Sequence, residues 1–102
     1  MVDEINYLLD SSKEISEDRF MRDATLQRAY TRSLEIIGEA TKGLSEEFRG
    51  KYLNVDWKSM AGMRDRLIHH YFGVDYEIVW DVIKNEIPKL KTQLQEILDE
   101  LE

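Results

Sequence analysis

The side chains best suited to chemistry in this sequence lie in one short stretch, residues 63–73. Eight consecutive positions hold two arginines, one carboxylate, two histidines and a tyrosine, namely Arg64, Asp65, Arg66, His69, His70 and Tyr71. These two histidines are the only ones in the chain. Arginine binds phosphate oxygens, and a neutral histidine can accept a proton. The stretch therefore predicts a site that binds a phosphate group or moves a proton.

Cleavage of an RNA phosphodiester is the reaction that suits these residues without a metal ion. His69 would take the proton from the ribose 2′-OH, and Arg64 would stabilise the charge that builds up on the phosphate oxygens. On a continuous helix Asp65 lies one turn before His69 and could orient its imidazole ring. Arg64 and His69 lie about 140° apart on such a helix. Both can therefore meet one phosphate only if the helix ends near His70 or if a second copy of the chain contributes.

A purely structural interpretation of the same residues is also open. His69 and His70 could lie at the C-terminus of a helix, where positive charge is favourable, and Arg64 could pair with a carboxylate inside the bundle. Asp65 and His69 have the spacing of two metal ligands, but no third ligand is evident nearby. We therefore predict no metal site and no cofactor.

Composition bounds the kinds of protein that this chain can be. With 102 residues, of which 42% are hydrophobic, it suits one domain over residues 1–102 with one core. It has no cysteine, so neither a disulfide nor a thiolate zinc site can form. The net charge of −7 argues against a broad nucleic-acid-coating surface, yet residues 19–70 carry ten Lys/Arg and seven Asp/Glu, a net of +3 that allows a local anion site. The acidic N-terminus lacks the pattern of a signal peptide, and no apolar run reaches the roughly 20 residues that span a bilayer, so we expect a cytoplasmic protein without a membrane segment.

The spacing of apolar residues predicts an all-α fold, an antiparallel bundle of four to five helices. Helices are expected over about residues 3–21, 23–43 and 57–73, and from residue 76 onward. Asp56 and Asp75 are expected as N-caps and Gly43 as a C-cap, and Pro88 must kink or interrupt the last helix. A stripe of small and apolar residues in the second helix, from Leu26 to Ala40, could pack within the chain or against a second copy.

The central stretch fits the Arg-x4-His-x-Tyr signature of the HepT-like branch of the HEPN superfamily, which this chain resembles. The flanking segments fit in the right order: residues 32–40 (RSLEIIGEA), residues 57–63 (WKSMAGM) and residues 71–75 (YFGVD). The resemblance covers about residues 3–100, nearly the whole chain. It implies an all-helical HEPN-type homodimer with the motif in a cleft between the subunits.

The resemblance also implies a function. Many HEPN proteins are metal-independent ribonucleases, and HepT-like members are typically toxins paired with an MNT-type nucleotidyltransferase antitoxin. That antitoxin transfers AMP from ATP to the motif tyrosine and silences the toxin. By position, Arg64 and His69 would be catalytic toward an RNA substrate, Asp65 and Arg66 would support them, and Tyr71 would accept AMP.

Two further functions stay open from the sequence. The chain could be a non-catalytic subunit that binds nucleotide or substrate for a minimal nucleotidyltransferase, or a purely structural dimerisation domain. The intact pair of Arg64 and His69 favours the ribonuclease. The acidic net charge and Asp65, where such families commonly have asparagine, favour the binding subunit.

Overall fold

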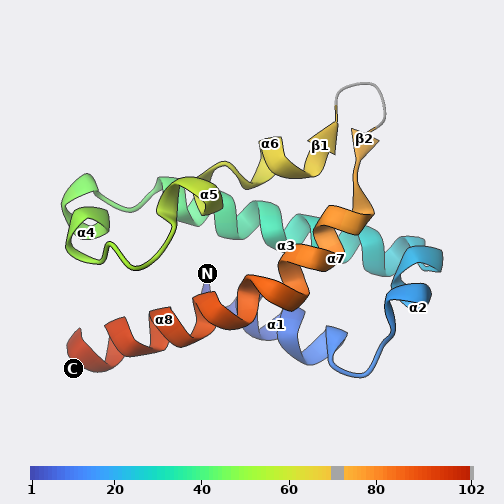
Figure 1. Ribbon diagram of the computed structural model, residues 1–102, viewed down its shortest axis with the longest axis horizontal. Helices are drawn as coiled ribbons and strands as arrows, with labels where there is room; N and C mark the ends of the chain where they lie inside the picture. Colours follow the sequence, from blue (N-terminus) through green and yellow to red (C-terminus); the bar gives the residue numbers. More distant parts are fainter. Residues whose placement is uncertain (70–72, 102) are drawn as a thin grey trace.

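The chain folds into helices joined by short connections, as a computed structural model shows for residues 1–69 and 73–101, with only the backbone of His69 described (Figure 1). The helices are α1 (Val2–Ser12), α2 (Glu17–Arg22), α3 (Ala24–Lys42), α4 (Glu46–Lys51), α5 (Trp57–Ala61), α6 (Met63–Leu67), α7 (Tyr76–Asn85) and α8 (Ile87–Leu101). Two short strands, β1 (Ile68–His69) and β2 (Gly73–Val74), form an antiparallel hairpin. The predicted all-α fold is confirmed, and this hairpin is its one departure within the described residues.

Side-chain caps fix where several helices begin. Asp56 accepts a hydrogen bond from the backbone N–H of Ser59 at 3.1 Å, and Asp75 accepts one from that of Ile78 at 3.2 Å. Each bond satisfies an amide that has no partner inside its own helix. The N-caps predicted at Asp56 and Asp75 are therefore confirmed, and α3 ends, as predicted, at a C-cap on Gly43.

The first predicted helix, over residues 3–21, is wrong as a single element. α1 ends at Ser12, and α2 begins after Ser16. The Ser16 hydroxyl accepts a hydrogen bond from the backbone N–H of Arg19 at 3.0 Å, which starts a new helix there. The Lys84 amine donates to the Ser12 carbonyl at 2.8 Å and so ties the end of α1 to α7.

The third predicted helix, over residues 57–73, is also wrong. It is broken at Gly62, between α5 and α6, and the helical backbone ends at Leu67. Ile68, a β-branched residue, has the extended angles φ −102° and ψ 121°. The backbone N–H of Asp75 donates to the Leu67 carbonyl at 2.8 Å, so a residue beyond the hairpin takes the place of a helical donor. The described part of the motif is therefore divided between a five-residue helix and the strand β1.

The last predicted helix is interrupted near its proline, as expected. α7 ends at Asn85 and α8 begins at Ile87, which places Pro88 in the first turn of α8. A proline is tolerated there because the first N–H groups of a helix have no intrahelical acceptor.

α3 is the helix on which most of the others pack, and it contacts α1, α2, α5, α6 and α7. Its side chains Tyr30, Leu34 and Ile37 are completely buried. Other members of the predicted apolar stripe are only half-buried and form what we call the α3 strip: Leu26, Ala29, Ile36 and Ala40. One chain alone therefore leaves this strip partly open to solvent.

The molecule is thin, with principal extents of 41 × 31 × 17 Å. Since a helix with its side chains is about 10 Å across, the short dimension has room for about two layers of helices. Within the described part of the chain, no helix combines the length and the apolar character needed to cross a membrane.

Candidate functional site

α6 carries the first motif arginine on a short, well-anchored helix. Met63 and Leu67, one turn apart, are both completely buried and face α3 and α7. Arg64 and Asp65 point away from that anchored side and are exposed. The local helix therefore presents a guanidinium group and a carboxylate to solvent on a backbone fixed by two core residues.

Gly38 of α3 allows α6 to pack closely. A Cβ atom at Gly38 would lie 3.1 Å from the Met60 carbonyl oxygen and 3.1 Å from the Met63 Cβ. Both distances are shorter than ordinary van der Waals contacts between such atoms. A glycine at this position thus lets the backbones of α3 and of the α5–α6 segment approach one another where the motif begins.

The hairpin after α6 positions the backbone of His69. Ile68 pairs with Val74, and His69 pairs with Gly73. Gly73 has φ 73°, in the left-handed region that glycine adopts without a steric penalty. The His69 backbone is therefore held in a strand that follows α6 directly.

This extended backbone changes the relation expected between Asp65 and His69. They are not one helical turn apart, because α6 ends at Leu67, and that prediction is wrong. The angle of about 140° between Arg64 and His69 does not apply either, since successive side chains on a strand point to opposite faces. His69 lies two residues beyond the last residue of α6, in β1, and not within the last turn of a helix. The His69 side chain, His70 and Tyr71 lie outside the described residues.

The exposed charges of α6, on Arg64 and Asp65, form no ion pair with a described residue. Across residues 1–68 and 73–101, no described side chain forms an ion pair or hydrogen bond with the Arg64 guanidinium or the Asp65 carboxylate. The structural alternative, in which Arg64 pairs with a carboxylate inside the bundle, is therefore not what the described residues show. Arg64 is available to bind an anion from solution.

Arg66, the second motif arginine, is engaged within the protein. Its Nη1 donates to Glu86 Oε1 at 2.9 Å, and its Nη2 donates to Glu86 Oε2 at 2.5 Å. Nη1 also donates to the Ser59 hydroxyl at 2.8 Å. The hydrogen bonds to Glu86 are the main cause that raises the pKa of Arg66 above its usual value. This Arg66–Glu86 brace joins α6 to α5 and to the junction of α7 and α8.

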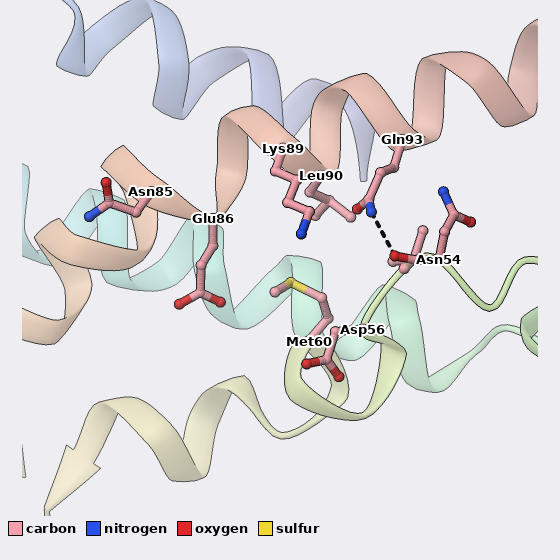
Figure 2. A pocket seen from close by; sticks show the side chains of 9 residues that line it. Asn54, Asp56, Met60, Asn85, Glu86, Lys89, Leu90 and Gln93 are labelled. Carbon is pink, nitrogen blue, oxygen red and sulfur yellow. Dashed lines mark hydrogen bonds between the residues drawn. The ribbon is translucent and has the colours of Figure 1, made fainter.

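A cavity of about 330 Å³ lies beside the brace, between the start of α5 and the α7–α8 junction (Figure 2). Glu86 and Lys89 reach into it from the junction, and Met60 lies across from them. The Gln93 side-chain amide donates to the Asn54 carbonyl at 2.7 Å and closes one end (Figure 2). None of the described motif residues lines this cavity. The cavity therefore lies among the residues that hold α6 in place, and not at the described motif residues.

Breaking the brace should destabilise the fold. Arg66→Ala leaves the Glu86 carboxylate, whose side chain is only 30% exposed, without its two donors. We expect the free energy of unfolding to fall by about 2 kcal/mol, the usual cost of leaving such a group unsatisfied. Chemical denaturation followed by circular dichroism measures the change.

The matched control for this prediction is Arg22→Ala. Arg22 and Asp18 are also 2.5 Å apart, but their side chains are 75% and 80% exposed. Losing this exposed pair should cost less than roughly 1 kcal/mol, since solvent screens it. Equal losses in the two variants would contradict the claim that burial makes the brace important.

Three supporting residues were not predicted from the sequence: Gly38, Ser59 and Glu86. Ser59 and Glu86 lie 7 and 20 positions from Arg66 and on other elements, so neither is a partner one helical turn away. Their roles depend on how the helices pack. Among the described residues there is also no cluster of three or more His, Cys, Asp or Glu that could hold a metal ion.

Comparison with known families gives a match over almost the whole chain. A family model described as "Ribonuclease HepT-like" matches residues 1–97, a range that includes α6 and the hairpin. The chain belongs to the HepT-like ribonuclease family. The resemblance predicted from the motif and its flanks is therefore confirmed.

Relatives of this HepT-like chain are similar over most of their length. "Putative RNase TTE0752" of Caldanaerobacter subterraneus is 53% identical over 98 residues, which are 96% of this chain and 88% of that protein. "Putative RNase MJ0127" of Methanocaldococcus jannaschii is 46% identical over 93% of this chain and 78% of its own. "Probable ribonuclease HepT" of Thermococcus cleftensis is 40% identical over 91% of this chain and 84% of its own. The comparison with solved structures found no significant match.

Proposed function

We propose that this HepT-like chain is a metal-independent ribonuclease that acts as the toxin of a toxin–antitoxin pair. The observation that carries the proposal is the Arg64 guanidinium, which is exposed and unpaired among the described residues and lies on the anchored helix that leads into the His69 strand. Membership of a family described as ribonuclease supports an RNA substrate for such an anion site.

In the proposed reaction His69 acts as the general base. It takes the proton from a ribose 2′-OH, and the 2′-oxygen attacks the adjacent phosphorus. The 5′-oxygen of the next nucleotide leaves and takes up a proton, so the products are a 2′,3′-cyclic phosphate and a 5′-OH. Arg64 donates hydrogen bonds to the non-bridging oxygens, on which negative charge increases in the transition state.

Asp65 and Arg66 support these two residues in different ways. The exposed Asp65 carboxylate follows Arg64 directly and adds a hydrogen-bond acceptor beside it. Arg66 acts through the brace to Glu86, which fixes α6 against α5 and the α7–α8 junction. Arg66 is therefore a positioning residue.

The 2′-OH provides the test of this mechanism. We expect the purified chain to cleave single-stranded RNA with EDTA in the buffer, because neither proposed catalytic group needs a metal ion. A substrate of identical sequence with 2′-deoxy sugars should stay intact, since it lacks the attacking oxygen. Gel electrophoresis of end-labelled substrates and mass spectrometry of the products measure both results. Cleavage of the deoxy substrate at a comparable rate, or a rate that EDTA abolishes, would exclude the mechanism.

We also propose that the working form is a homodimer in which the second and third predicted helices, here α3 and α5–α6, lie near a two-fold axis. The half-buried α3 strip supports this, because a partner would cover it. Sedimentation at micromolar concentration should give a dimer, and Ile36→Glu should give a monomer because it places a charge in the strip. A monomeric parent protein would contradict the proposal. A dimer that survives Ile36→Glu would place the interface on another face.

The proposed antitoxin is an MNT-type nucleotidyltransferase that transfers AMP to Tyr71. Tyr71 lies between His69 and Gly73 in the chain, and these two residues are paired across the hairpin. An AMP group on Tyr71 would carry a phosphate two positions from His69 in the sequence. That phosphate would compete with the phosphate of the substrate. One modification could then silence the enzyme without refolding it.

A further inference from the structure

The cavity beside the Arg66–Glu86 brace has the size of a small-molecule site (Figure 2). Its volume is about 330 Å³, and pockets that bind small molecules usually measure about 300–1,000 Å³. An apolar cavity of about 150 Å³ holds one benzene molecule, so this cavity has room for a body of about two fused rings. Val55, Met60 and Leu90 are the apolar residues of its lining, and each is at most 5% exposed. These residues favour an occupant with an apolar body.

The charge that the fold leaves unpaired in this cavity is positive. The Lys89 amine reaches into the cavity from the first turn of α8 (Figure 2). Across the part of the chain that the structure describes, no residue forms an ion pair or a hydrogen bond with this amine. The cavity therefore presents one ammonium group without a counter-ion from the described residues.

The two carboxylates of the lining are already engaged with the fold. Glu86 accepts the two hydrogen bonds that Arg66 donates in the brace. Asp56 accepts a hydrogen bond from the backbone N–H of Ser59 and so caps α5. Glu86 is the main cause that raises the pKa of Arg66, and the Asp56 carboxylate raises it further. Both carboxylates thus interact with groups of the protein, and Lys89 does not.

The same carboxylates limit the charge that a ligand can carry. A phosphate monoester has a charge of about −1.5 to −2 at neutral pH, and Asp56 and Glu86 would repel it across the cavity. A carboxylate carries one negative charge, which the single ammonium group of Lys89 can match with a charge-assisted hydrogen bond. A cation would be repelled by Lys89. A monocarboxylate therefore fits this lining best.

We propose that the cavity binds a small aromatic monocarboxylate, whose rings lie against Val55, Met60 and Leu90 and whose carboxylate pairs with Lys89. Met60 favours an aromatic body, because a methionine sulfur makes favourable contacts with aromatic rings. The ligand would also touch Glu86, which belongs to the brace that holds α6. None of the described motif residues lines this site, so its test needs no RNA and does not depend on the proposed ribonuclease reaction.

Isothermal titration calorimetry of the full chain with naphthylacetate tests this proposal. We expect saturable binding with a dissociation constant of about 1 mM or lower, as is usual for a ligand of this size. General attraction cannot produce this result, because the chain has a net charge of −7. Acetate lacks the rings, naphthyl phosphate carries more charge and naphthylmethylamine is a cation, so each should bind at least about tenfold more weakly. Absence of saturable binding by naphthylacetate, or equal or tighter binding by any of the three controls, would overturn the proposal.

A matched pair of variants locates the bound carboxylate. Lys89→Gln should weaken the binding of naphthylacetate by about tenfold or more, because it removes the charged donor. Lys91→Gln is the control, since Lys91 is also exposed on α8 but does not line the cavity, and it should bind as the parent chain does. Both side chains are exposed, so both variants should fold, which circular dichroism verifies. Unchanged binding by Lys89→Gln would place the ligand elsewhere, and equal losses in the two variants would show that only the general charge of α8 matters. Either result contradicts the proposal.

Discussion

Arg64→Ala and His69→Ala should each reduce the rate of RNA cleavage by about a hundredfold or more, the range for losing charge stabilisation or a general base. Arg64 is the arginine of α6 that has no ion-pair partner among the described residues. Its loss therefore removes the guanidinium N–H donors expected to bind the phosphate. His69→Ala removes the group that takes the 2′-OH proton. Single-turnover cleavage of an end-labelled RNA measures both rates. Growth of cells that express each variant shows whether toxicity is lost as well.

The control for this prediction is Arg28→Ala, which removes the same charge from an exposed position on α3. It should leave the rate nearly unchanged. Because Arg64 is exposed, Arg64→Ala should also unfold at nearly the same denaturant concentration as the parent protein. A full rate in either Arg64→Ala or His69→Ala would place the catalytic groups elsewhere. A large loss in Arg28→Ala would show that cleavage depends on the general basic charge of the chain.

Tyr71→Phe should abolish modification by an MNT-type nucleotidyltransferase. In the proposed transfer the Tyr71 hydroxyl oxygen attacks the α-phosphorus of ATP, and pyrophosphate leaves. Intact-protein mass spectrometry should show AMP-sized increments on the parent chain after incubation with such an enzyme and ATP, and none on Tyr71→Phe. The modified parent should lose RNA cleavage, because the added phosphate competes for Arg64. Arg66 is less available to it, since Glu86 already holds its guanidinium group.

Tyr7→Phe is the matched control for the modification. Tyr7 is 41% exposed on α1, so a transferase that modified any accessible tyrosine would reach it too. This variant should acquire the same increments as the parent chain, and peptide mapping should locate them on Tyr71. An increment on another residue, or none with an active transferase, would contradict this form of regulation.

Local sequence signals were enough for the fold class and for several helix boundaries. The caps at Asp56 and Asp75 and the break before Pro88 depend on groups within a few residues of each other, so they can be recognised in the sequence. The motif and its flanks were likewise enough for the family.

The geometry of the site was decided by contacts between distant residues. The spacing of apolar residues predicted a helix through residue 73. In the structure the Leu67 carbonyl instead accepts a hydrogen bond from the backbone N–H of Asp75, which follows the hairpin. The apolar pattern does not predict this hairpin. The motif resemblance assigns Arg64 to catalysis and Arg66 to support, but the sequence does not show which of the two guanidinium groups is paired within the fold. Only the packing of α6 against the α7–α8 junction brings Glu86 to Arg66 and leaves Arg64 open to solvent. Pairing of charges depends on distance in space, which the tertiary fold determines.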